Sequence, residues 1–176
     1  MDDPPEIPAA ALAPKSATRS RLTSAGAWRT AIVSGLGGAM AILILAGAGD
    51  LVHAPLLIAP FGASCVLVFA LPQSPLAQPR NVIGGHLISA AVGLATYALL
   101  GAHPWSFAIG VGAAIAAMQN TGTVHPPAGA DPVVVILAKA GWLFLLSPVL
   151  VGTLAIVAVA LVYHRWGSGR AYPSKD

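Results

Sequence analysis

The sequence has few charged residues. Only 9% of its 176 residues are Asp, Glu, Lys or Arg, whereas a soluble domain typically carries ~25%. Hydrophobic residues make up 56% of the chain. This shortage of charge excludes the water-facing surface of an ordinary soluble protein. The composition instead predicts an all-α, polytopic membrane protein whose main partner is the lipid bilayer.

Cysteine and paired metal-ligand spacings are also scarce. Cys65 is the only cysteine, so no disulfide can form within the chain. No CxxC or HxxxH spacing is present, and we expect neither a metal nor a cofactor. The sequence shows no recognisable nucleophile–base pair, so no enzymatic activity is expected. The few basic residues lack interleaved aromatics, which argues against nucleic-acid binding.

Basic residues flank the apolar part of the chain on both sides, at Lys15, Arg19, Arg21, Arg29, Arg165, Arg170 and Lys175. Basic flanks of membrane segments tend to stay in the cytoplasm. We therefore expect both termini to be cytoplasmic, an even number of crossings, and a location in a bacterial-type inner (plasma) membrane. Residues 1–26 read as a tail without a fold of its own, and 165–176 as a short basic tail.

Four stretches are apolar enough to predict membrane helices, at Trp28–Gly49, Val82–Leu100, Trp105–Met118 and Leu143–Tyr163. A helix needs ~20 apolar residues to cross the hydrocarbon core. Small residues are dense in these stretches, as in "GGHLISAAVG". Such residues let helices approach closely in lipid, so we interpret them as packing faces, which also allow a homo-oligomer, either a dimer or a trimer.

Two further apolar stretches are interrupted by proline and glycine. They are Ala54–Leu71, "APLLIAPFGASCVLVFAL", and the stretch from Thr121, whose helix-competent part is predicted at Val133–Ala140. At an offset of 67 residues, Pro60 aligns with Pro127, Gly62 with Gly129, and Ser64 with Asp131. The match predicts an internal duplication in the membrane domain 27–164, with halves at about 28–101 and 102–164.

The number of crossings depends on these two broken segments. If both cross, there are six segments with an odd number in each half, and the halves are inverted relative to each other, as in many transporters. If both dip in and return, there are four crossings with two re-entrant loops. We favour six segments, two of them discontinuous.

Broken segments at membrane depth predict a solute site, because freed backbone groups are tolerated only inside protein or beside a wet cavity. Ser64 is predicted to cap a helix starting at Cys65, and Asp131 to cap one with Pro132 in its first turn. The two helix starts would then offer N–H groups to an anion. An ionised Asp131 would repel that anion, so either the anion site lies at the Ser64 end, or Asp131 is neutral or paired. The pattern also fits a proton or cation acting at Asp131.

Two histidines fall inside the membrane region. His86 lies within an apolar helix and His125 begins "HPPAGADP"; intramembrane ionisable residues are functional candidates by default. His53 and His103 fall at segment ends and are expected at the interface. The predicted substrate-binding residues are Gly62, Ala63, Ser64, His86, Asn120, His125, Gly129, Ala130 and Asp131. Arg80 and Asn81 are predicted at the mouth of a pore, where Arg80 is either an anchor or an anion-attracting residue.

Three motifs, "PFGASCVLVF", "PLAQPRNVIGGH" and "HPPAGADP", together resemble the HPP family of integral membrane proteins. The resemblance covers about residues 28–163. The family is usually described with four transmembrane segments, and plant and cyanobacterial relatives are associated with nitrite transport. The resemblance therefore implies a permease or channel for a small inorganic anion, with nitrite as the expected substrate.

Other functions stay open at this stage. A transporter for a neutral or cationic solute would use Asp131 as its key group. A structural or sensor protein without transport would not depend on His125 or Gly129. Channel-like and alternating-access movement are not distinguished by the sequence.

Overall fold

The computed structural model describes residues 25–174, and the predictions for residues 1–24 and 175–176 lie outside this range. The described residues are helical and contain no strand. The elements are α1 (Ala25–Val52), α2 (Ala59–Cys65), η3 (Val66–Ala70), η4 (Pro75–Ala77), α3 (Pro79–Leu100), α4 (Pro104–Thr121), η5 (Pro126–Ala130), α5 (Asp131–Leu137), η6 (Trp142–Leu145), η7 (Leu146–Leu150), α6 (Val151–Tyr163) and η8 (His164–Ser168).

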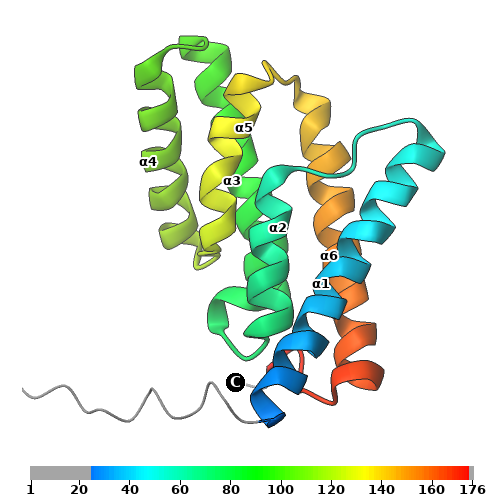
Figure 1. Ribbon diagram of the computed structural model, residues 1–176. Helices are drawn as coiled ribbons and strands as arrows, with labels where there is room; N and C mark the ends of the chain where they lie inside the picture. Colours follow the sequence, from blue (N-terminus) through cyan, green and yellow to red (C-terminus); the bar gives the residue numbers. More distant parts are fainter. Residues whose placement is uncertain (1–24, 175–176) are drawn as a thin grey trace, which may run out of the picture.

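The helices form six consecutive segments that alternate in direction (Figure 1). The α1 segment is followed by α2 with η3, by α3, by α4, by η5 with α5, and by the run from η6 to η8. The first and last described helices begin and end at the same end of the molecule. The first three segments thus run opposite to the last three, as the predicted inversion requires.

Three of the helices described here are long and apolar enough to cross a membrane, at Gly26–Val52, Pro79–Leu100 and Trp142–Ser168. Two shorter apolar helices cover Ala59–Ala70 and Pro126–Leu137. At ~1.5 Å per residue each rises by only about 18 Å, less than the ~30 Å hydrocarbon core. These short helices are the two broken segments of the sequence.

The internal duplication is visible in these short helices. Their first residues, Ala59 and Pro126, and their last, Ala70 and Leu137, both lie 67 positions apart. Their close contacts repeat as well. A Cβ on Gly85 would lie 2.9 Å from the carbonyl oxygen of Thr123, and one on Gly152 would lie 3.1 Å from that of Leu56. The two glycines and the two carbonyls are again 67 positions apart.

The ends of the second short helix differ from the prediction of Val133–Ala140. Its helical path begins at Pro126, because prolines fit the first turn of a helix, where no N–H is needed. It ends at Leu137, and Lys139 then adopts a left-handed conformation with a φ of 49°. The "HPPAGA" motif is therefore helical after its histidine.

The predicted helix caps are wrong. Ser64 lies inside α2, which begins five residues earlier, and its neighbour Cys65 is followed directly by η3. Asp131 is the first residue of α5, and Ala130 before it is the cap, with no side-chain hydrogen bond. The prolines start both short helices upstream of the predicted caps, so Ser64 and Asp131 project from the helices as side chains available to other partners.

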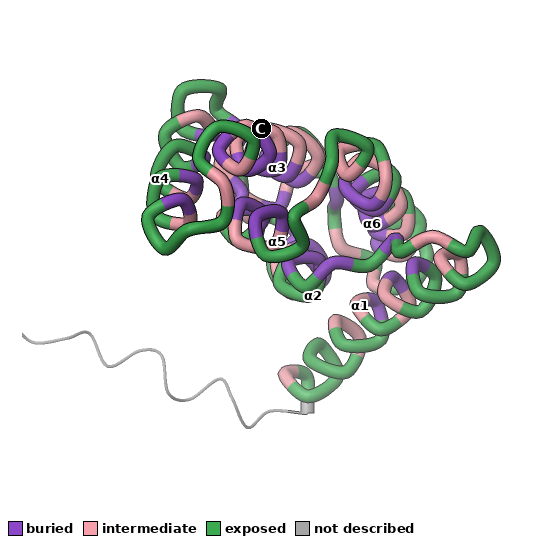
Figure 2. The backbone as a smooth tube through the Cα atoms, turned by 90° about the horizontal axis from the view of Figure 1, so that it is seen from above, coloured by how far each residue is buried: buried purple, intermediate pink, exposed green. Residues whose placement is uncertain are grey.

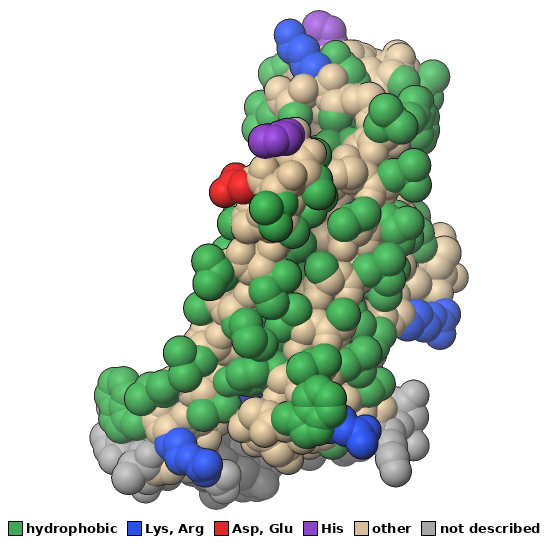
Figure 3. All heavy atoms as spheres, turned by 90° about the vertical axis from the view of Figure 1, so that its right-hand side faces the viewer, with side chains coloured by type: hydrophobic (Ala, Val, Ile, Leu, Met, Phe, Trp, Pro, Cys, Tyr) green, Lys and Arg blue, Asp and Glu red, His purple; other side chains and the backbone are tan. Residues whose placement is uncertain are grey.

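Buried residues lie along the facing sides of α2, α3, α5 and α6, while α1 and α4 stand at opposite margins (Figure 2). The outward faces are apolar, as Figure 3 shows for one side of the molecule. Large exposed side chains such as Leu43, Leu99 and Leu143 are 73%, 83% and 78% exposed. Surfaces of this kind fit contact with lipid tails rather than water.

Candidate functional site

A chain of four buried polar side chains runs through the centre of the molecule. Ser64 Oγ lies 2.7 Å from His86 Nε2 and 2.9 Å from His125 Nε2. On its other side, His86 Nδ1 lies 2.7 Å from Asp131 Oδ2. His125 Nδ1 lies 2.8 Å from the carbonyl oxygen of Leu76. All four side chains are fully buried.

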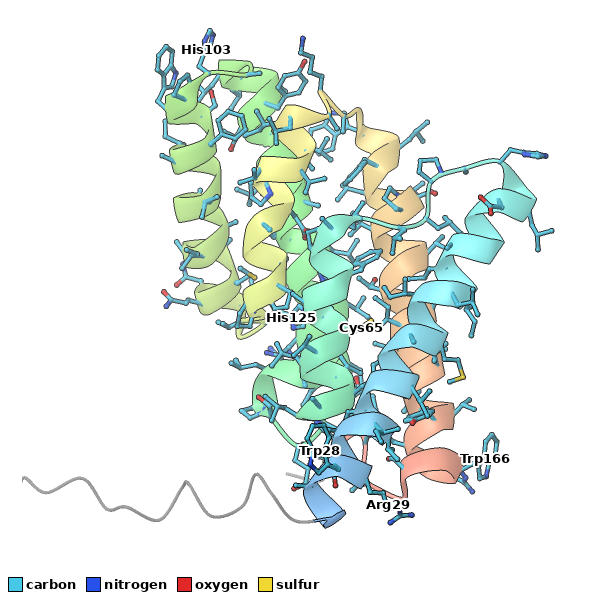
Figure 4. All side chains as sticks on the ribbon, in the orientation of Figure 1. Trp28, Arg29, Cys65, His103, His125 and Trp166 are labelled. Carbon is cyan, nitrogen blue, oxygen red and sulfur yellow. The ribbon has the colours of Figure 1, made fainter. Side chains whose placement is uncertain are left out.

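Three segments supply the members of this polar chain. Ser64 comes from α2, His86 from α3, His125 from the residue just before η5, and Asp131 from the start of α5. Gly85 permits the close approach of α3, since a Cβ there would lie 2.7 Å from that of His125. In Figure 4 His125 lies below the middle of the bundle, toward the end where the described chain begins and finishes.

The surroundings of the polar chain are apolar. The ring of Phe61 packs edge-on against His86, with the ring centroids 5.3 Å apart. The two imidazole rings lie 5.0 Å apart at 63°. Burial in such surroundings makes every unpaired donor, acceptor or charge costly.

The number of hydrogens follows from the geometry. The contacts from Leu76 O to Asp131 Oδ2 form four hydrogen bonds and need four hydrogens. A carbonyl only accepts, so His125 Nδ1 carries a hydrogen, and in a neutral His125 the unprotonated Nε2 accepts from Ser64. The remaining two bonds are filled if Asp131 is a neutral acid, or if its carboxylate faces a His86 imidazolium. In both cases the polar chain is neutral overall.

The sequence left open whether Asp131 is neutral or paired, and in the structure it is paired with His86. Its other oxygen, Oδ1, has no hydrogen-bond partner. A neutral carboxyl group tolerates an unpaired carbonyl oxygen better than a carboxylate tolerates an unpaired charged one. The arrangement therefore favours the neutral acid, with its O–H donated to His86.

The order Asp131–His86–Ser64 matches the acid, base and nucleophile of a serine hydrolase. Sequence reasoning found no nucleophile–base pair, because 22 and 45 residues separate the partners along the chain. Two features differ from the usual arrangement of that triad. Ser64 also bonds a second imidazole, and none of the three side chains is exposed. Linked imidazole, hydroxyl and carboxyl groups of this kind can share protons among themselves.

The structure brings together four of the predicted binding residues and leaves the others apart. Gly62 and Ala63 are exposed on α2, Gly129 is half-buried, and Ala130 is exposed. Asn120 is exposed at the end of α4. These residues are not part of the polar chain, and substrate binding by them stays a prediction.

Gly62 faces a different feature, a groove between α1 and the first short helix. The groove has a volume of about 1300 Å³ and is lined mainly by small and apolar residues, among them Gly35, Gly38, Cys65 and Val66. None of the four residues of the polar chain lines it. The helix therefore carries Gly62 on one side and Ser64 on the other.

Arg80 and Asn81 secure the segment that carries His125. An Arg80 guanidinium N–H donates to the Thr121 carbonyl at 2.8 Å, and the Asn81 amide donates to the Val124 carbonyl at 2.9 Å. The two bonds tie the start of α3 to the end of α4 and to the link that follows it. The sequence left Arg80 open as either a cytoplasmic anchor or an anion-attracting residue and did not predict these bonds; a role at a pore mouth stays a prediction.

Sequence reasoning also missed the backbone partners. The carbonyl of Leu76 holds His125, and that of Pro60 lies 3.3 Å from Ser64 Oγ. Nearby, Ser89 donates to the Ala128 carbonyl at 2.6 Å. Backbone acceptors carry no sequence signal. Among the described residues no group of three or more His, Cys, Asp or Glu is placed to hold a metal.

Comparison with known proteins decides the family. The family model described as "HPP, transmembrane region" matches residues 23–173. The chain belongs to the HPP transmembrane family. Within this HPP family member, the histidine of the His-Pro-Pro motif is His125, and it is one of the four members of the polar chain.

Two curated relatives of this HPP protein are transmembrane proteins of Dictyostelium discoideum. One is 38% identical over 125 residues, which cover 66% of this chain and 44% of the relative. The other is 36% identical over 125 residues, covering 66% and 40%. The chain thus spans less than half the length of either relative. No solved structure matches the HPP protein.

Proposed function

We propose that this HPP protein transports a small inorganic anion, with nitrite as the expected substrate, across a bacterial-type inner membrane. The single observation that carries the proposal is the buried polar chain from Asp131 to His125, held between two antiparallel short helices. Buried ionisable groups are costly in a membrane and mark solute or proton pathways. Paired interrupted helices of an inverted repeat typically form the substrate site of a transporter.

The side chains of the site favour an anion over a cation. Asp131 is the only acidic member, and it is already paired with His86. The imidazoles carry N–H groups, which can donate to an anion but not to a cation. A cation would instead need an acidic group free of such a partner. The resemblance to nitrite-associated members of the family supports the same substrate class.

The distribution of basic residues supports cytoplasmic termini. Arg29, Arg80, Arg165 and Arg170 belong to the end of the bundle where the described chain begins and finishes, with Arg29 labelled there in Figure 4. Lys139 follows α5 at the opposite end (Figure 1). By the positive-inside rule the first end would face the cytoplasm.

Flux through purified protein in liposomes tests the proposal. We expect saturable, protein-dependent uptake of nitrite and weaker uptake of other small monovalent anions. Asp131→Asn separates the substrate classes, because its amide N–H can replace the carboxylic O–H that faces His86. Uptake of an anion should survive this substitution, whereas uptake of a cation should be lost. Absence of any protein-dependent anion flux in the wild type would refute the proposal.

The transporter for a neutral or cationic solute remains the alternative. The unpaired Oδ1 of Asp131 is the observation that favours it, since a buried acceptor without a partner invites a donor from a ligand. Uptake of a neutral amide or of an alkali cation, lost in Asp131→Asn and unaffected by nitrite, would establish this alternative.

A further inference from the structure

Besides His86 Nε2, which lies 2.7 Å away, Ser64 has two acceptors for its single hydroxyl hydrogen. One is His125 Nε2 at 2.9 Å, and the other is the Pro60 carbonyl at 3.3 Å. Its oxygen can also accept two hydrogen bonds. The hydroxyl group can therefore donate to His125 while accepting from His86, or donate to Pro60 while accepting from both imidazoles.

These two arrangements differ by one proton. In the first, Ser64 donates to an unprotonated His125 Nε2, and the polar chain is neutral. In the second, His125 Nε2 has gained a proton and donates to Ser64, whose hydrogen has turned to Pro60. Every member of the chain keeps a partner in both arrangements, because His125 Nδ1 donates to Leu76 throughout. No heavy atom has to move.

The proton adds a positive charge to a fully buried group. An uncompensated charge in apolar surroundings is strongly unfavourable. Asp131 does not supply the compensation, because the polar chain with its extra proton keeps a net positive charge even when Asp131 is a carboxylate beside a His86 imidazolium. The other hydrogen-bond partner of His125 is the carbonyl of Leu76 in η4, which lies in the link between the first short helix and α3. The charged arrangement thus calls for an anion bound at the same time.

We propose that this HPP protein takes up one proton with each monovalent anion, so that transport is an electroneutral proton–anion symport. His125 Nε2 forms an N–H bond with the incoming proton and releases it again, and Ser64 turns its hydroxyl group between His125 and the Pro60 carbonyl. The inference rests on the proposed anion transport and adds the coupled ion and the residues that carry it.

Simultaneous measurement of anion and proton flux tests the coupling. Proteoliposomes containing the full chain and an internal pH dye receive an inward gradient of nitrite or of nitrate. Nitrate is the more stringent substrate because its acid does not exist as a neutral molecule near neutral pH. We expect one proton to enter with each anion, at a rate unchanged by a potassium–valinomycin clamp.

The possible failures are distinguishable. Anion uptake without proton entry, or uptake that the clamp accelerates, overturns the symport and leaves anion transport standing. No protein-dependent uptake of either anion overturns both proposals. Protein-free liposomes give the background from permeation of nitrous acid.

Substitutions assign the coupling to the named residues. His125→Gln removes the site that gains the proton, and Ser64→Ala removes the hydroxyl group that turns. In both we expect proton entry per anion to fall to background or anion flux to fall by about tenfold, the equivalent of one lost hydrogen bond. Ser89→Ala removes a buried hydroxyl bond outside the polar chain and should keep one proton per anion. Unchanged coupling in His125→Gln overturns the assignment.

A binding measurement covers the case in which a variant is inactive. Adding nitrate to weakly buffered, detergent-purified protein should raise the pH as each occupied protein takes up a proton. Wild type and Ser89→Ala should show this uptake and His125→Gln should not. Anion binding to the wild type without a pH change overturns the proposal.

Discussion

Ser64 contacts both histidines because a hydroxyl group donates and accepts within the space of one atom. Its oxygen lies 2.7 Å from one imidazole nitrogen and 2.9 Å from the other. Alanine would leave both nitrogens facing a void, and cysteine would be larger and a weak donor. The identity of this single residue therefore decides whether the polar chain is continuous.

Ser64→Ala should lower stability more than Ser89→Ala. Both side chains are fully buried hydroxyls, but Ser64 bonds two imidazoles, whereas Ser89 bonds one carbonyl at 2.6 Å. An unsatisfied buried polar group costs about 1–3 kcal/mol, and Ser64→Ala leaves two of them. Thermal unfolding in detergent measures the difference. Equal melting temperatures for the two variants would show that the polar chain contributes nothing beyond a single hydrogen bond.

At the scale of elements, two glycines of α3 allow the site to form. Added Cβ atoms would lie 2.7 Å from the Cβ of His125 at Gly85, and 2.7 Å from the Cα of Pro132 at Gly93. Both contacts involve the segment that carries His125 and Asp131. The small-residue packing face expected from "GGHLISAAVG" is thus confirmed for α3, and it faces the functional segment.

Gly85→Ala should disrupt the site, and Gly112→Ala should not. A Cβ at Gly85 needs His125 or the Thr123 carbonyl to move, whereas nothing lies within 4 Å of a Cβ at Gly112 in α4. Alanine is favoured over glycine within a helix by about 1 kcal/mol, so Gly112→Ala should keep or raise the melting temperature while Gly85→Ala lowers it. An unchanged melting temperature in Gly85→Ala would contradict the close approach of α3 to the segment that carries His125.

The segment after η8 holds the loop that carries Leu76. Arg170 donates to the carbonyls of Phe69 and Ala70, at 3.3 and 3.0 Å, and Tyr172 donates to that of Ala77 at 3.0 Å. Burial raises the pKa of the Tyr172 phenol, so it stays protonated and able to donate. These bonds hold residues 170–172 against the C-terminal ends of η3 and η4.

Arg170→Ala should loosen this segment. Backbone amide hydrogens of residues 170–172 should then exchange with deuterium faster than in the wild type, because the guanidinium no longer holds the segment to Phe69 and Ala70. Arg165→Ala is the matched control, since Arg165 is exposed and lies over the ring of Trp166 instead. Equal exchange rates in the two variants would argue against anchoring by Arg170.

At the scale of the whole molecule, the inverted repeat frames a single site to which both halves contribute. The equivalents Ser64 and Asp131 both bond His86, whose own equivalent 67 positions on is Thr153. Thr153 is buried and donates to the carbonyls of Val149 and Leu150, one turn earlier, at 2.8 and 3.1 Å. The duplication therefore supplies a symmetric frame, and the polar chain within it is not repeated.

Both ends of the described chain should lie on one side of the membrane. Cys65 is buried and is the only cysteine, so cysteines placed at exposed Arg165 and Lys139 report on the two ends of the bundle. An impermeant maleimide added to intact cells should label the Lys139 position and not the Arg165 position. Labelling of both positions from the same side would contradict the six-segment arrangement.

The sequence predicted the membrane class, the six segments and the duplication, because apolar length and the proline–glycine breaks are local signals. It also named all four members of the polar chain. It did not predict their contacts. Ser64 and Asp131 were expected to cap helices, yet the prolines move the helix starts upstream and turn both side chains toward His86. Tertiary contacts between separate segments leave no local signal, and neither do backbone acceptors such as Leu76.

The most direct measurement is nitrite uptake by proteoliposomes containing the wild type, Ser64→Ala or Ser89→Ala. If the polar chain is the transport site, uptake is saturable in the wild type, is kept in Ser89→Ala, and falls by about tenfold or more in Ser64→Ala, as expected for the loss of a shared buried hydrogen bond. Equal uptake by all three proteins would contradict the central claim, and so would uptake no faster than in empty liposomes.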